Sequence, residues 1–189
     1  SKILYKLSKN ASRKNLKKFI NLSIEKELNK NKDKNDLNIG SGGELEDLIK
    51  NNFQNVFSID IDEKRNPDQL LDICDENFEK KIKINPSLVC CFEVLEHTKS
   101  PEKAVKNIFS IMSKDDYFLV SVPFNFHIHD EPNDFYRFTF YGLKMLFKDF
   151  SKVEIKKRNG WLESIFVNLI RLEKEKNIIS KIVGKFFII

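Results

Sequence analysis

Three closely spaced glycines and a later aspartate carry the clearest chemical signal in the sequence. Gly40, Gly42 and Gly43 are half of the six glycines in the chain of 189 residues. Glycine allows a tight turn and lets the main chain approach a ligand without a Cβ in the way. Asp60 lies 20 residues after Gly40, at the end of an expected strand, where its carboxylate is placed to accept both hydroxyls of a ribose. The spacing predicts a site for an adenosine-containing ligand; the alternative is a tight turn beside a solvated aspartate.

A second group of titratable residues lies among aromatic side chains. Residues 124–141 hold seven of the 22 aromatic residues of the chain. The titratable members of this stretch are His127, His129, Asp130, Asp134 and Arg137. Such groups inside an aromatic wall are where pKa values are most easily tuned. We expect the stretch to overhang a ligand crevice; the alternative is a structural lid held by an Asp–Arg pair and a small aromatic core.

The elements that must position these residues alternate between strands and helices. Strands are expected over residues 37–39, 56–61, 88–92, 117–122 and 153–155, and helices over 12–28, after the glycines, from 101 to 112, and over 141–147 and 161–172. This alternation predicts an α/β fold, a Rossmann-like open and mostly parallel sheet with helices on both faces, with an N-terminal helical arm and a C-terminal amphipathic helix. Ligands of such sheets bind beyond the carboxyl ends of the strands.

The glycine loop does not fit a dinucleotide fingerprint, because G-x-G-x-x-G needs a third glycine where Leu45 stands. The loop instead resembles the first motif of the class I S-adenosylmethionine-dependent methyltransferases, which reads roughly acid-x-G-x-G-x-G. Asn38 replaces the acid, Gly43 stands one place early, and Glu44 occupies the position of the last glycine.

Two further segments strengthen this resemblance, which covers about residues 36–160. Residues 92–97, Phe-Glu-Val-Leu-Glu-His, are similar to the end of the fourth strand and the EVLEH turn of the methyltransferase-11-like group. Residues 129–139, HDEPNDFYRFT, closely resemble the HDxPxDYYRFT segment of bacterial methyltransferases often associated with surface-polysaccharide assembly.

The resemblance implies a fold, a cofactor and a set of residues that bind it. The implied cofactor is S-adenosyl-L-methionine, and the implied activity is methyl transfer, with oxygen as the expected acceptor atom. The expected cofactor-binding residues are Asn38, Gly40, Ser41, Gly42, Asp60, Ile61, Asp72, Ile73, Phe92 and Glu93. The implied acceptor is a small sugar- or phosphate-containing molecule, with capsule or other surface-polysaccharide biosynthesis as the setting.

Methyl transfer assigns chemical roles to the aromatic-rich stretch. An alcohol acceptor must lose a proton, and histidine is the natural base near neutral pH. We expect His129 to be this base or to orient the acceptor, Asp130 to fix its tautomer or touch the substrate, and Arg137 to bind an anionic part of the substrate. His127, Asp134 and Tyr136 are expected to contact the substrate, while His97, at a turn, is interpreted as structural.

Other chemistries are disfavoured by spacing. The histidines at 97, 127 and 129 have no companion cysteine set and no HxxxH pair, so no metal site is predicted. Phe92-Glu93-Val94 replaces the Asn/Asp-Pro-Pro-aromatic motif of base-modifying amino-methylases, and no cysteine follows a proline. A nucleic-acid substrate is therefore not expected.

Charge and hydropathy divide the chain into three expected parts. Residues 1–35 form a basic helical arm, since residues 1–34 carry eleven Lys/Arg against three acids; residues 36–160 form the S-adenosylmethionine-binding domain, and residues 161–189 an amphipathic helical segment. That segment could complete the core, form a homo-oligomer seam or contact a membrane peripherally. Because it stops on Phe-Phe-Ile-Ile, we interpret it as truncated. Three cysteines without a signal peptide indicate the cytoplasm.

Two alternative functions remain at this stage. One is a non-catalytic, methyltransferase-like binding or scaffold protein, motivated by Asn38 and Glu44 in the glycine loop. The other is an RNA methyltransferase that uses the basic arm, whose net charge of +8 over residues 1–34 suits a polyanion.

Overall fold

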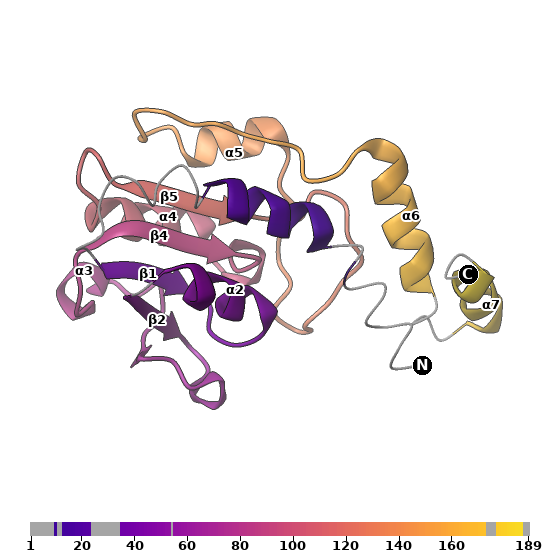
Figure 1. Cartoon of the computed structure of the whole chain (residues 1–189), viewed down its shortest axis with the longest axis horizontal. Helices are drawn as coiled ribbons and strands as arrows, with labels where there is room; N and C mark the ends of the chain where they lie inside the picture. The colour runs from indigo at the N-terminus through magenta and orange to yellow at the C-terminus, as the bar shows by residue number, and fades with distance from the viewer. Residues whose placement is uncertain (1–9, 11–12, 24–34, 54, 173–176, 187–189) are drawn as a thin grey trace. The chain divides into compact units, whose positions relative to one another are not determined.

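The computed structural model describes residues 10, 13–23, 35–53, 55–172 and 177–186 (Figure 1). The chain divides into two compact units. One unit comprises Ser1–Leu22, Asn125–His127 and Ile155–Ile189, and the other comprises Ser23–Phe124 and Ile128–Glu154. Much of the predicted basic arm, including residues 1–9 and 24–34, lies outside the described residues.

The larger unit is built on a sheet of five parallel strands (Figure 1). The strands are β1 Asn35–Ile39, β2 Val56–Asp60, β3 Gln69–Leu70, β4 Pro86–Phe92 and β5 Tyr117–Ser121, in the order β3-β2-β1-β4-β5. The predicted α/β fold with an open parallel sheet is confirmed. The strand order reverses between β1 and β4, and a crevice at such a reversal is where open α/β sheets bind ligands.

Strand β4, which lies between β1 and β5, is buried along its whole length. Its sequence, PSLVCCF, has the continuous apolar character of a strand covered on both faces. Ile39 of β1 lies opposite both Ile59 of β2 and Cys91 of β4, so the carboxyl ends of these three strands meet at one edge. Burial raises the pKa of the Cys90 and Cys91 thiols, which makes both inert core residues rather than nucleophiles.

The helices of the larger unit follow the strands in alternation. They are α2 Glu44–Asn52, α3 Phe78–Lys81, α4 Pro101–Ser110 and α5 Phe140–Leu146, with short 3-10 turns η1 Glu63–Arg65 and η2 Leu95–His97. Helix α4 begins with Pro101 in its first turn, where the missing N–H costs nothing. It buries Ala104, Val105 and Ile108 in the core.

Several local predictions were wrong, and each error has a physical cause. The apolar spacing of residues 101–112 predicts Phe109 on the core side of α4, but Phe109 is 42% exposed, because it lies at the edge of the helix face that buries Ala104, Val105 and Ile108. Residues 153–155 form no strand; the segment is short, flanked by lysines, and Val153 is 40% exposed. Strand β3 and helix α3 were not predicted because two and four residues show no periodicity.

The smaller unit contains a helix over residues 13–23, α6 Trp161–Arg171 and α7 Ile178–Phe186. Leu16, Ile20, Val167 and Ile170 are buried. Asn15 Nδ2 donates to Glu163 Oε2 over 3.2 Å, which links the first of these helices to α6. The helical spacing of apolar residues predicts Ile24 on the same face as Leu16 and Ile20, and Ile24 lies outside the described residues.

A search of the described helices finds none with the length and apolar character needed to cross a membrane.

Replacing Ile108 by Ala should lower the free energy of unfolding by about 2–5 kcal/mol, because it removes a fully buried side chain from the core. Phe109→Ala is the matched control on the same helix and should cost clearly less. Urea titration followed by circular dichroism measures both; equal losses would contradict the placement of α4.

Candidate functional site

The glycine loop after β1 has a backbone that other residues adopt only with strain. Gly40, Gly42 and Gly43 have φ values of +91°, +86° and +81°. A Cβ on Gly40 would lie 2.6 Å from Val94 Cγ2, in the turn after β4. A Cβ on Gly43 would meet nothing within 4 Å. Gly40 is therefore needed for packing against the neighbouring strand end, while Gly43 borders open space.

The side chains of Asn38 and Glu46 hold this loop in place. Asn38 is buried, and its Nδ2 donates to the carbonyl oxygen of Gly40 over 3.0 Å. The Gly42 N–H donates to the Glu46 carboxylate, which also pairs with Lys50 over 2.8 Å. An amide at position 38 thus holds the loop through a donor that an acid does not have.

Asp60 ties the loop to the end of β2. Its Oδ2 accepts the Ser41 N–H over 2.7 Å, and its Oδ1 accepts the Asp62 N–H over 2.8 Å. Arg65 donates to the Ser41 carbonyl oxygen over 3.0 Å. Each carboxylate oxygen retains acceptor capacity, so Asp60 can position the loop and still accept ribose hydroxyls.

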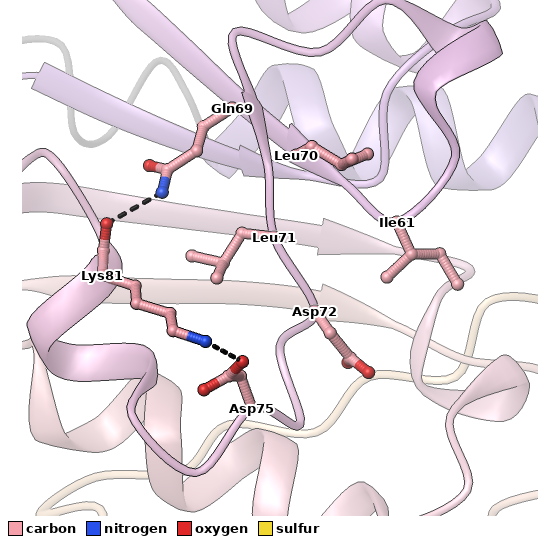
Figure 2. A pocket seen from close by; sticks show the side chains of 7 residues that line it. All are labelled: Ile61, Gln69, Leu70, Leu71, Asp72, Asp75 and Lys81. Carbon is pink, nitrogen blue, oxygen red and sulfur yellow. Dashed lines mark hydrogen bonds and ion pairs between the residues drawn. The ribbon is translucent and has the colours of Figure 1, made fainter.

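A pocket of about 450 Å³ lies beside β2 and β3 (Figure 2). Its lining consists of Ile61, Gln69, Leu70, Leu71, Asp72, Asp75 and Lys81. Ile61 and Leu70 are 67% and 57% exposed, and Asp72 places a carboxylate near them. Apolar side chains beside an acid suit the faces and the amino group of an adenine ring.

One predicted member of this pocket lies elsewhere. Ile73 was expected to bind the cofactor together with Asp72, but its side chain is buried in the core and does not line the pocket. The Asp72 carboxylate accepts the Cys74 N–H over 2.7 Å, and the chain turns here. The turn places the Asp72 side chain in the pocket and the Ile73 side chain in the core.

The loop and pocket fit an adenosine-containing cofactor. Positive φ values, the open space at Gly43 and the acid at the end of β2 provide a close backbone approach and a ribose acceptor. Ser41 is fully buried, and its Oγ has no hydrogen-bond partner within the part of the chain that the structure describes. A polar atom in this position is available to a ligand that reaches the loop.

Glu93 turns the chain sharply where β4 ends. It has a φ of +58°, its N–H donates to Ser121 of β5 over 3.0 Å, and its Oε1 accepts the Ser121 hydroxyl over 2.7 Å. Phe92, just before it, is 6% exposed. The turn directs the following 3-10 turn η2 to the carboxyl edge of the sheet.

Backbone hydrogen bonds fasten the aromatic-rich stretch to η2. The carbonyl oxygen of Glu96 accepts the N–H groups of Phe135 and Tyr136 over 2.8 and 3.2 Å. The Tyr136 hydroxyl donates to the Lys99 carbonyl oxygen over 3.2 Å. These bonds bring residues that are nearly 40 positions apart in the chain to the same edge of the sheet.

Two histidines meet where these segments join. The rings of His97 and His129 pack edge to face with their centroids 4.9 Å apart. His97 Nδ1 lies 2.7 Å from the Asn133 carbonyl oxygen, and His129 Nδ1 lies 3.2 Å from Asp134 Oδ2. Beside them the Glu96 side chain is fully buried. We call Glu96, His97 and His129 the histidine cluster.

Asp134 contacts both His129 and Arg137. Its carboxylate accepts two hydrogen bonds from Arg137, over 2.6 and 2.7 Å, and the His129 N–H over 2.9 Å. The Arg137 guanidinium, the backbone donor and the neighbouring His129 ring hold the pKa of Asp134 well below its usual range. Asp134 therefore stays ionised and orients both side chains.

The structure shows the contacts of four residues whose roles were predicted. The carboxylate that holds the His129 ring is Asp134, whereas Asp130 lies 4.0 Å from His97 Nε2. The Arg137 guanidinium donates two hydrogen bonds to Asp134, and its expected contact with an anionic part of the substrate stays a prediction. His127 belongs to the smaller unit, where its ring centroid lies 4.3 Å from that of Phe126.

Two members of the cluster were not predicted as site residues. His97 was interpreted as structural, and Glu96 was not singled out. The signal that could have found them is their position just after β4, since the ends of parallel strands share one edge.

Comparison with known proteins agrees with this geometry. Residues 10–161 match the sequence model of a family described as a methyltransferase domain. A search of curated proteins finds no match to the chain. In methyltransferases of this class I type the methyl donor is S-adenosyl-L-methionine, and the glycine loop, Asp60 and the pocket beside β2 and β3 are the groups that would hold it.

Gly40→Ala should weaken binding of S-adenosylhomocysteine by about tenfold or more, because a Cβ would clash with Val94 and a positive φ costs an alanine roughly 1–2 kcal/mol. Calorimetric titration measures the affinity. The control is Gly160→Ala, where φ is −68° and a Cβ would come no closer than 3.8 Å to another side chain. Unchanged affinity in Gly40→Ala would remove the loop from the binding site.

Asp134→Ala should destabilise the fold by about 3–5 kcal/mol at neutral pH, because it leaves the partly buried Arg137 without its ion pair. Since the folded-state pKa of Asp134 is lowered, its contribution is present above the usual aspartate pKa of about 3.9 and is lost as the pH falls below it. The gap in unfolding free energy between the wild type and Asp134→Ala should therefore narrow between pH 5 and pH 3.

The exposed neighbour Asp130 provides the control for this experiment, since 75% of its side chain is accessible. Asp130 has a φ of +53°, which asparagine tolerates better than alanine, so the control is Asp130→Asn, which should change stability little at any of these pH values. A gap for Asp134→Ala that stays constant with pH would show that its carboxylate is not the stabilising group.

Proposed function

This chain belongs to the methyltransferase domain family, and from that premise we propose that it methylates an oxygen atom of a small, sugar-containing or phosphate-containing acceptor. The residue pattern 129–139 supports surface-polysaccharide biosynthesis, such as capsule assembly, as the setting. The observation that carries the proposal is the His129–Asp134–Arg137 chain of contacts at the carboxyl edge of the sheet.

The chain's own residues need to hold the donor and prepare the acceptor. The methyl group of S-adenosylmethionine is already activated by the positively charged sulfur. The glycine loop, Asp60 and the Ile61–Asp72 pocket hold the donor's adenosine part. Alignment of the two reactants at the strand ends then accounts for much of the rate enhancement.

His129 is placed to handle the acceptor proton. Its Nδ1 faces the ionised carboxylate of Asp134, which favours the tautomer that carries its proton on Nδ1. The other nitrogen, Nε2, is then the one with a lone pair, and it can accept a proton from a hydroxyl near neutral pH. This arrangement supports oxygen rather than carbon as the methylated atom.

The charges around His129 favour a hydroxyl-bearing acceptor. Glu93, Glu96, Asp130 and Asp134 lie on or beside the two segments that form the site, and Arg137 donates hydrogen bonds to Asp134 and to the Tyr136 carbonyl oxygen. Carboxylates accept hydrogen bonds from sugar hydroxyls but repel phosphate. We therefore place the sugar part of the acceptor, rather than a phosphate, at this end of the site.

The direct experiment presents a panel of acceptors with S-adenosylmethionine and measures formation of S-adenosylhomocysteine. The panel should include free sugars, nucleotide-linked sugars and sugar phosphates, with a structured RNA as the alternative substrate. Methylation of a sugar hydroxyl, located by mass spectrometry of the product, supports the proposal. Methylation of the RNA alone would contradict it.

His129→Ala should lower kcat by about 100-fold or more, because the group that accepts the hydroxyl proton is gone. Affinity for S-adenosylhomocysteine should stay close to that of the wild type, since His129 lies outside the cofactor loop. Glu131→Gln, an exposed position in the same segment, is the control. An unchanged kcat in His129→Ala would reduce His129 to a structural residue.

A further inference from the structure

We propose that the histidine cluster, Glu96, His97 and His129, binds one divalent transition-metal ion. Each of the three residues offers one ligand atom, and these atoms all lie within 4.8 Å of one another. The set contains two imidazole nitrogens and one carboxylate oxygen, which suits ions such as Zn²⁺ or Co²⁺ better than Ca²⁺ or Mg²⁺.

The spacing of the ligand atoms is close to what one ion requires. Two ligands at about 2.1 Å from a metal are about 3.4 Å apart in a tetrahedral site. His97 Nε2 already lies 3.8 Å from Glu96 Oε1. Since the ligand atoms lie within 4.8 Å of one another, the widest separation has to shrink by up to about 1.4 Å on metal binding.

The contacts of the Nδ1 atoms of His97 and His129 give independent support for a metal site. Metal-binding histidines typically donate their second ring N–H to a carbonyl or a carboxylate, which fixes the tautomer. Here His97 Nδ1 faces the Asn133 carbonyl oxygen, and His129 Nδ1 faces the Asp134 carboxylate. Both arrangements leave Nε2 as the nitrogen with a lone pair, which is the form that a metal ion binds.

The electrostatics of the cluster also favour a cation. Glu96 is a carboxylate with no exposed surface, and the attraction between a divalent ion and a carboxylate is stronger in such a buried position than in water. Asp130 Oδ2 lies 4.0 Å from His97 Nε2, on a side chain that is 75% exposed. Asp130 is therefore placed as a fourth ligand or as a base at the solvent side, with a further position open to the acceptor.

This inference deepens the proposed function and rests on it for its consequence. An acceptor hydroxyl bound to the ion loses its proton more easily than a free one, and the proton passes through Asp130 to water. The oxygen then forms a bond to the methyl carbon, while the carbon–sulfur bond breaks and leaves its electron pair on sulfur. His129 acts as a metal ligand in this scheme, and the ion takes over the task of lowering the acceptor pKa.

Metal binding is tested without any acceptor. The full chain, freed of metal with a chelator and dialysed, is titrated with Co²⁺ and followed by visible absorption, and Zn²⁺ is titrated by calorimetry. We expect one ion per chain and a Co²⁺ spectrum typical of mixed nitrogen and oxygen ligation. No saturable binding of either ion would overturn the proposal.

Variants assign the binding to the cluster. Glu96→Gln and His97→Gln should each weaken Co²⁺ binding by at least about tenfold, while His127→Gln, a histidine of the other unit, should leave it unchanged. Unfolding curves and S-adenosylhomocysteine affinity check that each variant folds. If Glu96→Gln does not fold, His97→Gln alone decides, because its side chain is 21% exposed. Unchanged binding in His97→Gln would refute the site.

Activity separates this inference from the proposed function. Loss of methyl transfer on chelation, restored by Zn²⁺ or Co²⁺, supports a metal that takes part in the reaction. Transfer that survives chelation and His97→Gln would overturn the metal proposal while the proposed function stands. Metal binding without methylation of any sugar acceptor would keep the site and refute the function.

Discussion

The parallel pairing of β1 with β4 is the constraint on which the rest of the structure depends. These strands lie at the centre of the sheet, and the strand order reverses between them. Each is followed by a turn with positive φ, at Gly40 and at Glu93. Because the two turns are neighbours, a side chain at Gly40 would collide with Val94. The glycine loop, which we propose receives the cofactor, and the turn that leads to Glu96 and His97 are therefore packed against each other.

A second constraint brings the acceptor side to that surface. The aromatic-rich stretch after β5 has few regular elements, and its position comes from hydrogen bonds to the Glu96 carbonyl oxygen and from the Asp134–Arg137 ion pair. The Asp134 carboxylate contacts both the backbone N–H and the ring of His129. A single buried carboxylate thus positions a chemical group that lies in a loop, where backbone structure alone would leave it free.

The sequence was sufficient for the fold class and for the positive-φ backbone of the glycine loop, and less so for the contacts of the aromatic-rich stretch. Strands β4 and β5 follow from runs of apolar residues, β1 and β2 from short apolar segments beside the glycine loop and Asp60, and the glycine loop follows from residue type, because positive φ restricts the choice of residue. Contacts between Asp134 and His129, or between His97 and His129, depend on how an irregular segment folds back. No periodicity encodes that path, which is why Asp130 was assigned the role that Asp134 has and why His97 was interpreted as structural. The different positions of Ile73 and Asp72 were likewise not predictable from the sequence, since a single turn places Ile73 in the core and Asp72 in the pocket.

The central claim is that the cofactor binds across the ends of β1, β2 and β4. Backbone amide chemical shifts, recorded by NMR while S-adenosylhomocysteine is added, test it most directly. The account predicts that the largest shifts fall on the amides of Ser41, Gly42 and Gly43, with Ile61, Asp72 and Glu93 next, while those of α7 stay in place. Saturable shifts that leave Ser41 to Gly43 unchanged, or no shifts at all, would contradict it.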